Sequence, residues 1–586
     1  MLTVCRGSKM KFRPAVILLG GFFYLLSLPL YSAQQDKDRS AIASAHPLAT
    51  AAGFEILEQG GNAFDAAVAI SATLAVVEPM GSGLGGGGFW LLHRASDGFQ
   101  TMLDGREKAP AAATRDMYLD KQGKVIDRLS LDGTLAAAIP GLPAALVHLA
   151  SNYGSLPLRQ SLLPAIRAAE KGFAVYPRYQ QLLEFRKPYL NDAAKEIFLN
   201  KSGAVPAVGA VIRQANLAAT LRRLAIGQRD GFYKGETANK LLDAVNSSGG
   251  IWTQADLDNY QVVERVPVTG NYRGARIVTA ALPSSGGIVL VEILNILSGF
   301  DLDALTPLQR KQKIIEAMRL AYRDRAEYLG DDDFVQVDQS RLISMPYADQ
   351  LRSTITDRAI PSEFLSDRPV PEGQDTTHFS VIDQQGNRVS ATLSINYPFG
   401  SGVVAAGTGV VLNNEMDDFA ASPGVENVYG LIGSEANAIE AGKRPLSSMT
   451  PTFVEENGTV LVVGTPGGSR IISMVLLAVL DYLHGRGSIN DWLARGRFHH
   501  QYYPDVVQFE PGAFSEAEQA QLSNLGYELK ELQRIYGNMH VVLQNGADGS
   551  LQAASDPRWL GKAEVKSPQR KQSKDVDELK KIGASQ

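Results

Sequence analysis

The stretch Asp375-Thr376-Thr377-His378-Phe379-Ser380 places a threonine where a polar loop becomes a buried strand. A hydroxyl needs a base before it can act as a nucleophile. If the bond before Thr376 were cut, the freed α-amine, with a pKa of about 7.7–8, would be that base. One residue would then supply both the nucleophile and the base. Because threonine also simply favours strands, this interpretation depends on the rest of the chain.

The secondary-structure pattern changes at this point of the sequence. Apolar spacing before it predicts mainly helices, at 51–58, 63–77, 158–171, 213–225, 286–297 and 308–328, with strands at 89–93 and 276–282. The charges of 308–328 are expected on its exposed face. A serine-, proline- and charge-rich loop at 353–374 follows. Beyond it, strands are predicted at 377–382, 388–395, 409–413, 451–455 and 459–464, and a helix at 469–483. Strands that pair through hairpins between helical regions predict a layered α+β fold.

Three downstream segments offer the groups that an acyl-transfer site needs. Segment 412–419 (LNNEMDDF) sets acidic side chains at a strand end, and 444–451 (RPLSSMTP) sets two adjacent hydroxyls before a strand. Segment 464–470 (GTPGGSR) predicts a strand, a glycine turn and a helix N-terminus. Backbone N–H groups at such a turn are suited to stabilise an oxyanion. Glycines also let a substrate carbonyl approach them closely.

Several other patterns point away from cofactor and metal chemistry. The glycine run 83–88 matches G-x-G-x-x-G but follows a helix and precedes a strand, the reverse of the dinucleotide-binding context; it predicts a loop that passes close to another backbone. The adjacent His499-His500 pair lacks metal-ligand spacing, and Asp331-Asp332-Asp333 lacks that of a calcium loop. No Gly-x-Ser-x-Gly elbow is present. We therefore expect no metal and no cofactor.

The composition is that of a globular protein. Apolar residues make up 45% and charged residues 20% of the 586 positions, and the net charge of −5 excludes a broadly basic nucleic-acid binder. The single cysteine, Cys5, excludes an internal disulfide framework.

The N-terminus has the order of a secretory signal. Basic residues precede an apolar run at 15–30, and the small residues Ser32 and Ala33 then precede a polar segment. The run is shorter than the ~20 residues of a spanning helix, so we predict a signal peptide at 1–33, export to the periplasm or beyond, and no membrane association after its removal. The charged C-terminal segment 566–586 is predicted to be a disordered tail.

Nine separated motifs occur in an order that resembles the γ-glutamyltransferases, or glutathione hydrolases, which are self-cleaving N-terminal-nucleophile hydrolases. The similarity spans about residues 40–560. The motifs are GNAFDAAVA (61–69), GLGGGGF (83–89), DGREKAPAAAT (104–114), PSSGG (283–287), DTTHFSV (375–381), LNNEMDDF (412–419), NVYGLIG (427–433), KRPLSSMTPT (443–452) and GTPGGSR (464–470). The resemblance implies a four-layer αββα sandwich. It also implies cleavage between Asp375 and Thr376, giving a large subunit (34–375) and a small subunit (376–586) that remain associated as a heterodimer.

The resemblance also assigns roles residue by residue. Thr376 matches the nucleophile, Gly467 and Gly468 match the oxyanion donors, and Thr392 and Ser394 lie where the family supports the nucleophile. Arg106, Ser447 and Ser448 match contacts to the substrate α-carboxylate. Asn396, Glu415 and Asp418 match those to its α-ammonium, and Tyr429 matches a lid over the site.

These residues predict the substrate and the reaction. A γ-glutamyl group carries a carboxylate and an ammonium on one carbon, and Arg106 with two serines, opposite Asp418, would recognise both. Thr376 would attack the γ-carbonyl of glutathione or a related compound to form an acyl-enzyme. Water would complete hydrolysis, whereas an amino acid or peptide amine would complete transfer.

Two alternatives remain open. One is a family relative that acts on another amide, as a cephalosporin acylase or a poly-γ-glutamate processing enzyme does. The other is an uncut protein that binds γ-glutamyl compounds without turnover.

Overall fold

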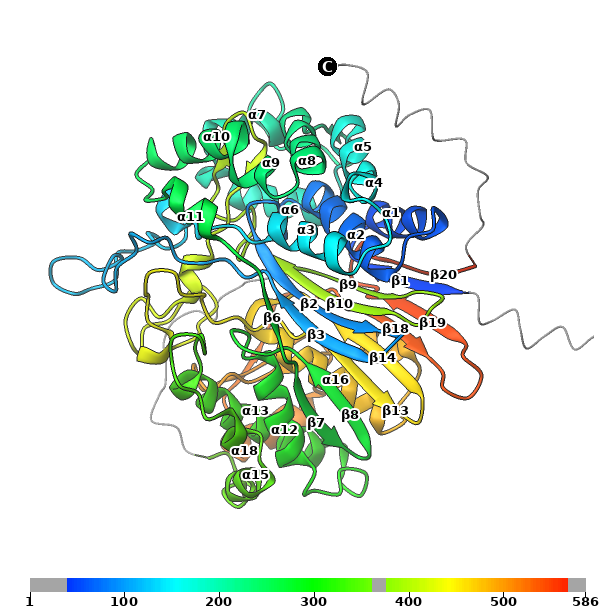
Figure 1. Cartoon of the computed structure of the whole chain (residues 1–586). Coiled ribbons are helices and arrows are strands. Elements are labelled where there is room, and N and C mark those ends of the chain that lie inside the picture. Colours follow the sequence, from blue (N-terminus) through cyan, green and yellow to red (C-terminus); the bar gives the residue numbers. More distant parts are fainter. Residues whose placement is uncertain (1–38, 361–375, 568–586) are drawn as a thin grey trace, which may run out of the picture.

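Two stacked antiparallel sheets form the centre of the molecule (Figure 1). The computed structural model describes residues 39–360 and 376–567. The first sheet has the strand order β20 (Lys562–Lys566), β1 (Ser40–Ser44), β9 (Thr377–Ile382), β10 (Arg388–Ser394), β2 (Gly87–Arg94), β3 (Phe99–Asp104), β6 (Val263–Arg265). The second has the order β19 (Leu551–Ser555), β18 (His540–Gln544), β14 (Thr459–Gly464), β13 (Thr452–Glu456), β8 (Ala275–Thr279), β7 (Val268–Tyr272).

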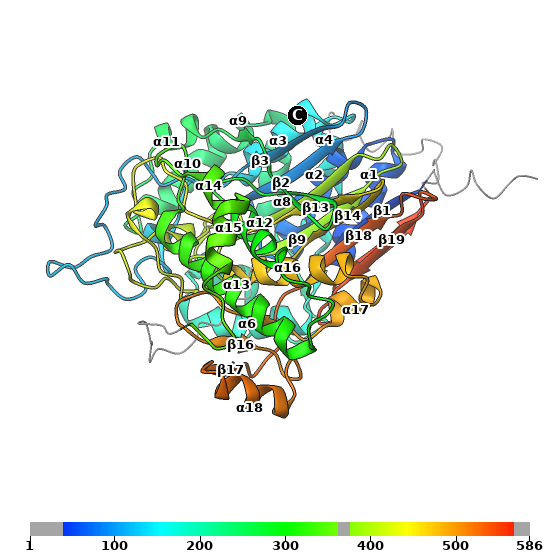
Figure 2. The same cartoon turned by 90° about the horizontal axis from the view of Figure 1, so that it is seen from below.

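Helices cover the outer face of each sheet, which completes the αββα sandwich (Figure 1). Those over the first sheet are α1 (Pro47–Glu58), α2 (Ala63–Val77), α3 (Leu142–Asn152), α4 (Leu158–Ser161), α5 (Leu163–Lys171), α6 (Pro177–Arg186), α7 (Asp192–Phe198), α8 (Ala215–Gly227), α9 (Asp230–Tyr233), α10 (Gly235–Asn246) and α11 (Gln254–Asn259). Figure 2 views the other side, with α12 (Gly286–Leu297), α13 (Pro307–Tyr328), α14 (Gln339–Leu342), α15 (Met345–Arg352), α16 (Ile471–Leu483), α17 (Ile489–Ala494) and α18 (Glu516–Asn524).

The short strands lie outside the two main sheets. They form the pairs β4 (Phe173–Ala174) with β5 (Val211–Ile212) and β11 (Val404–Ala405) with β12 (Val410–Val411), and a three-stranded sheet of β15 (Phe498–His499), β16 (Val507–Phe509) and β17 (Leu529–Glu531).

Strand β9 carries a different side-chain chemistry on each face, because alternate residues of a strand point in opposite directions. Phe379 and Val381 join the apolar core under the α1–α11 layer. His378 and Ser380 face the second sheet, where the Ser380 hydroxyl donates to the His540 carbonyl oxygen. Position 376, directly before this strand, therefore lies at the rim of the gap between the two sheets.

Both sheets combine strands from before and after position 376. The first sheet takes β1, β2, β3 and β6 from the earlier part and β9, β10 and β20 from the later part. The second takes β7 and β8 from the earlier part and the remaining four from the later part. The two parts therefore share one core, and neither contains all the strands of either main sheet.

The expected αββα architecture is confirmed, with local corrections. The predicted helix 158–171 is two helices, α4 and α5, because Pro164 begins a new helix after Leu162. The predicted strand 409–413 shortens to β12. The predicted tail begins too early, since Lys566 ends β20 and lies opposite Ser40.

The charged face of α13 is the largest correction. We expected it to be exposed, but Lys313, Glu316, Arg319, Asp324 and Arg325 are all buried. The predicted signal segment, Cys5, Asp375 and residues 568–586 lie outside the described residues. Within the described ranges, no helix has the length and apolar character needed to cross a bilayer.

Candidate active site

Thr376 lies directly before β9, with 7% of its surface exposed. Its Oγ1 is 3.2 Å from the Oγ of Ser394, which ends β10. The Ser394 hydroxyl in turn accepts the Asn396 N–H at 2.8 Å. The Thr376 backbone adopts a φ of 123°, a value that β-branched residues rarely adopt. The structure thus brings the predicted nucleophile and the Ser394 hydroxyl together.

Thr392 does not join this pair. It lies on the same face of β10 as Ser394, two residues earlier, and its hydroxyl is 2.9 Å from Nδ1 of His378. Burial holds the pKa of His378 well below its ordinary value, so the ring is neutral. In the structure Thr392 contacts this histidine and not Thr376.

The backbone under Thr376 and Ser394 is formed by the glycine run 83–88 and its neighbour Gly81. A Cβ on Gly86 would lie 2.1 Å from the Ser394 carbonyl oxygen, and one on Gly85 would lie 2.0 Å from that of Val411. These distances are far below a van der Waals contact, so only glycine fits. The prediction of a loop that passes close to another backbone is confirmed.

Arg106 is buried in a cluster of acids. Its Nη1 lies 2.6 Å from Oε2 of Glu415, and its Nη2 lies 2.6 Å from Oδ2 of Asp418. The sequence placed Arg106 opposite Asp418 across a substrate; the structure instead pairs the two directly. The reason is electrostatic, since an anionic partner offsets the cost of burying a guanidinium.

The acids near Arg106 titrate unusually. Burial raises the pKa of Glu415 to about 8, although Arg106 opposes the shift. Burial and the neighbouring Glu415 raise the pKa of Glu107 well above its ordinary value. Burial likewise raises the pKa of Asp417, next to this cluster, to about 7. These shifts favour the protonated form of Glu415 and Glu107 at neutral pH, so the direct ionic partner of Arg106 at the pocket is Asp418.

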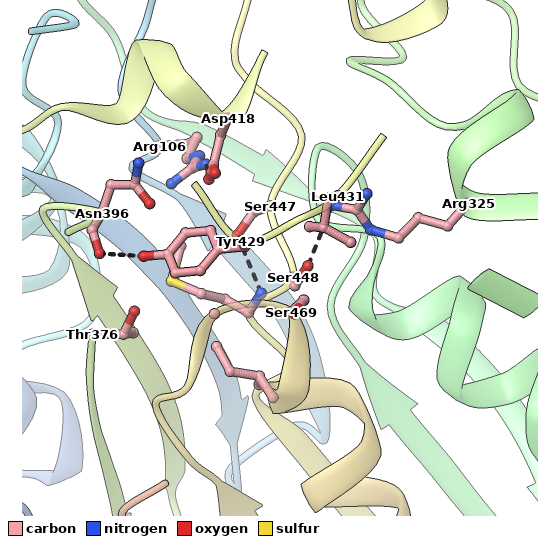
Figure 3. A pocket seen from close by; sticks show the side chains of 13 residues that line it. Arg106, Arg325, Thr376, Asn396, Asp418, Tyr429, Leu431, Ser447, Ser448 and Ser469 are labelled. Carbon is pink, nitrogen blue, oxygen red and sulfur yellow. Dashed lines mark hydrogen bonds and ion pairs between the residues drawn. The ribbon is translucent and has the colours of Figure 1, made fainter. Parts of the chain in front are cut away.

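Ser447 and Ser448 line a different side of the pocket, next to Arg325 of α13 (Figure 3). Arg325 Nη2 donates to the Ser448 hydroxyl at 3.3 Å, and its Nε donates to the Ser285 hydroxyl at 3.0 Å. Ser285 also donates to the Ser447 carbonyl oxygen at 2.7 Å. Arg325 thus links the start of α12 to the serine segment.

The glycine turn follows β14 and leads through the 3-10 turn Gly468–Arg470 into α16. Gly467 has a φ of 144° and Gly468 a φ of 57°, both in the region that favours glycine. A Cβ on Gly468 would lie 2.7 Å from the Tyr429 ring. The turn therefore requires glycine for its backbone, and at Gly468 also for the close contact with Tyr429.

Tyr429 covers the pocket (Figure 3). Its hydroxyl donates to the Asn396 carbonyl oxygen at 2.7 Å. Its own carbonyl oxygen accepts the Gln501 amide at 3.1 Å. Two residues earlier, Asn427 donates to Asp418 at 3.2 Å. The predicted lid is therefore hydrogen-bonded to both the nucleophile side and the acidic side of the pocket.

Most of the predicted site residues line the pocket, together with residues that the sequence did not indicate. The predicted residues that line it are Arg106, Thr376, Asn396, Asp418, Tyr429, Ser447, Ser448 and Gly468. The added ones are Arg325, Leu431, Met449, Ser469 and Ile471. Leu431, Met449 and Ser469 lie inside recognised motifs, so their place in the pocket could have been predicted from the sequence. Arg325 had no such signal, because a helix charge is normally solvated.

The acidic triplet Asp331-Asp332-Asp333 is separate from this pocket. Its carboxylate oxygens lie within 4.8 Å of one another. Arg265 donates to Asp332 and Asp333, and the Arg444 N–H donates to Asp331. These arginine contacts offset part of the negative charge of the acidic turn.

An αββα sandwich with a buried threonine directly before one of its inner strands is typical of the N-terminal-nucleophile hydrolase class. The gamma-glutamyltranspeptidase family model matches residues 49–565, and the chain belongs to that family.

Individual relatives agree with the family. The chain is 45% identical over 499 residues to a glutathione hydrolase proenzyme of Pseudomonas sp. (strain A14), covering 83% of this chain and 86% of the relative. It is 42% identical over 529 residues to the glutathione hydrolase proenzyme of Escherichia coli (strain K12), covering 88% and 90%. Its structure is similar to that of cephalosporin acylase from Bacillus halodurans, with a TM-score of 0.79, 29% identity, and 90% and 95% of the two chains covered.

Proposed function

We propose that this protein hydrolyses the γ-glutamyl amide of glutathione and related γ-glutamyl compounds, and transfers the γ-glutamyl group to amino acids or peptides. The observation that carries the proposal is one pocket that joins Thr376 to both halves of a zwitterion site. Acidic groups at Asp418 and Glu415 suit an α-ammonium, and hydroxyl and guanidinium groups suit an α-carboxylate.

The reaction follows from the positions of these groups. The Thr376 Oγ1 attacks the γ-carbonyl carbon while its proton passes to the α-amine of the same residue. The N–H groups of Gly467 and Gly468 stabilise the oxyanion. The amide bond then breaks, the leaving amine takes the proton, and a γ-glutamyl ester on Thr376 remains. Water or an acceptor amine attacks that ester and regenerates the hydroxyl.

The α-amine becomes available through self-cleavage between Asp375 and Thr376, which yields a large subunit, 34–375, and a small subunit, 376–586. The φ of 123° at Thr376 supports this step. Such a backbone costs of order 1–3 kcal/mol. Because φ is defined by the preceding carbonyl carbon, breaking that peptide bond removes the constraint. The shared sheets then hold the two subunits together as a heterodimer.

We place the enzyme in the periplasm, with secretion as the alternative destination. The basic, apolar and small-residue order of 1–33 supports export. A chain whose only cysteine precedes the apolar run needs no disulfide to fold there.

The alternative function is that of an acylase on another amide, which the cephalosporin acylase likeness favours. Asp418, the acidic partner of Arg106, favours the γ-glutamyl substrate. An acyl group without an α-ammonium would offer this carboxylate no cation. An uncut binding protein is the third candidate.

Mass and N-terminal sequencing of the purified protein, with turnover of a chromogenic γ-glutamyl anilide, tests the proposal. We expect a small subunit of about 23 kDa that begins Thr-Thr-His-Phe-Ser. Thr376→Ala should remain a single uncut and inactive chain. A cut Thr376→Ala chain would refute the nucleophile assignment, and a mature wild type without anilide turnover would favour the acylase.

A further inference from the structure

Arg325 is a buried cation that faces the pocket without an acidic partner. It is 5% exposed. Its guanidinium donates to two neutral hydroxyls, those of Ser285 and Ser448. Within residues 39–360 and 376–567 it forms no ion pair with a carboxylate. A buried charge without a counter-ion is costly, so its retention at the pocket wall needs an explanation.

The contrast with Arg106 suggests one. Arg106 contacts Glu415 and Asp418, each at 2.6 Å, and the ion pair with Asp418 offsets its charge before any substrate arrives. Arg325 lines the same pocket through α13 and the serine segment (Figure 3). Among the described residues, Arg325 is therefore the cation of this pocket that no carboxylate pairs with directly.

Ser448 connects this charge to the pocket. Because Nη2 of Arg325 donates to the Ser448 oxygen, the Ser448 hydrogen is left to point elsewhere. Both serines of the segment line the pocket, so an anion placed there meets a hydroxyl donor backed by a cation. A guanidinium also has five N–H donors, and these two contacts use only two of them.

We propose that Arg325 is a specificity-determining residue, which draws the α-carboxylate of the γ-glutamyl group to the Ser447-Ser448 side of the pocket. The α-ammonium then occupies the acidic side at Glu415 and Asp418. This inference rests on the proposed γ-glutamyl function. It differs from the sequence-based assignment, which gave the carboxylate to Arg106 and the two serines alone.

The test removes the charge of Arg325 from the protein and, separately, the α-carboxylate from the substrate. Arg325→Gln should lower kcat/KM for a γ-glutamyl anilide by about 10- to 150-fold, the range of a lost charge-assisted hydrogen bond. For the 4-aminobutanoyl anilide, which lacks only the α-carboxylate, the same substitution should change kcat/KM less than about threefold. Arg325→Lys should recover part of the loss on the first substrate.

Dissociation constants, measured by isothermal titration calorimetry, give the same comparison without turnover. L-Glutamate should bind Arg325→Gln more weakly than wild type, whereas 4-aminobutyrate should bind both alike. Arg323→Gln is the matched control, because Arg323 lies on the same helix, pairs with Asp324 at 2.7 Å and does not line the pocket. Ser448→Ala is the second variant and should show the same carboxylate-selective loss.

An equal loss on both anilides, or no loss on either, would overturn the proposal and leave Arg325 as a link between α12 and the serine segment. Maturation and melting temperature are measured for each variant. If Arg325→Gln fails to mature, Ser448→Ala and Arg325→Lys carry the comparison. If the mature wild type does not cleave the γ-glutamyl anilide, the proposed function fails instead, and the dissociation constants of L-glutamate and 4-aminobutyrate still report on Arg325.

Discussion

The hydroxyl of Thr376 lies 3.2 Å from the hydroxyl of Ser394, and the Asn396 N–H donates to the same Ser394 oxygen. Either hydroxyl can be the donor in this pair, because the Ser394 oxygen can accept the Asn396 hydrogen and still accept a second one. In either direction the contact holds the Thr376 oxygen beside the end of β10.

Ser394→Ala should lower both the rate of self-cleavage and kcat of the mature enzyme by about 3- to 10-fold, the effect of one neutral hydrogen bond. Ser394→Thr should restore both, since it keeps the hydroxyl. Time-resolved gel analysis of maturation and steady-state turnover measure the two rates. Thr392→Val is the control: its hydroxyl contacts His378, so kcat of the mature variant should stay within about twofold of wild type. A larger fall in kcat would indicate that the Thr392 hydroxyl takes part in catalysis.

Gly468→Ala should reduce kcat by about 10²- to 10³-fold, as does loss of one oxyanion donor. The added Cβ would lie 2.7 Å from the Tyr429 ring, and the φ of 57° is unfavourable for alanine. Either the turn or the lid must move. Gly442→Ala tests the backbone penalty alone, because its φ is 77° but nothing lies within 4 Å of its Cβ. An unchanged kcat in Gly468→Ala would place the oxyanion donors elsewhere.

Asp418→Asn should raise KM for the γ-glutamyl anilide by about 10-fold or more, because a contact to the α-ammonium loses its charge. The glutaryl anilide, which lacks that ammonium, should be cleaved no worse by the variant than by wild type. Kinetics on the two substrates separate recognition from a general loss of the Arg106 pairing, which would affect both.

Glu415 should make stability depend on pH. Its folded-state pKa of about 8 exceeds the ordinary value of 4.5, so the folded protein holds this proton more tightly than the unfolded chain. The resulting stabilisation is complete below about pH 4.5 and is lost as the pH rises to about 8. Melting temperatures between pH 5 and pH 8 should therefore fall less steeply in Glu415→Gln than in wild type. Glu435→Gln, which changes an exposed carboxylate paired with Arg115 at 2.9 Å, should keep the wild-type slope. Equal slopes for Glu415→Gln and wild type would contradict the shift.

The sequence predicted the elements that local pattern determines. The bounds of α2, α12, β9 and β14 agree with the structure. Three of these elements are mainly apolar and β9 alternates apolar with polar residues, and each has a cap or a turn at an end. The motifs likewise located most of the pocket lining.

What could not be predicted depends on contacts between distant parts of the chain. Arg106 and Asp418 are 312 positions apart, and only the folded sheets bring them into contact. The charges of α13 follow a pattern that normally faces water, yet Arg325 contacts Ser448 and Arg319 contacts Asp505, in the loop between β15 and β16. These contacts bury Arg325. The pattern of charges along α13 alone does not indicate which distant segments will cover the helix.

The distribution of strands across position 376 has a consequence for how the mature protein behaves. Each product of the cut would contribute strands to both sheets, so the pair is an interleaved unit and not two modules docked at a surface. We expect one cooperative melting transition and no exchange of subunits between molecules on mixing. Maturation would change the connectivity of the chain while leaving its packing intact, so the folded precursor serves as the template on which its own two-chain product is assembled.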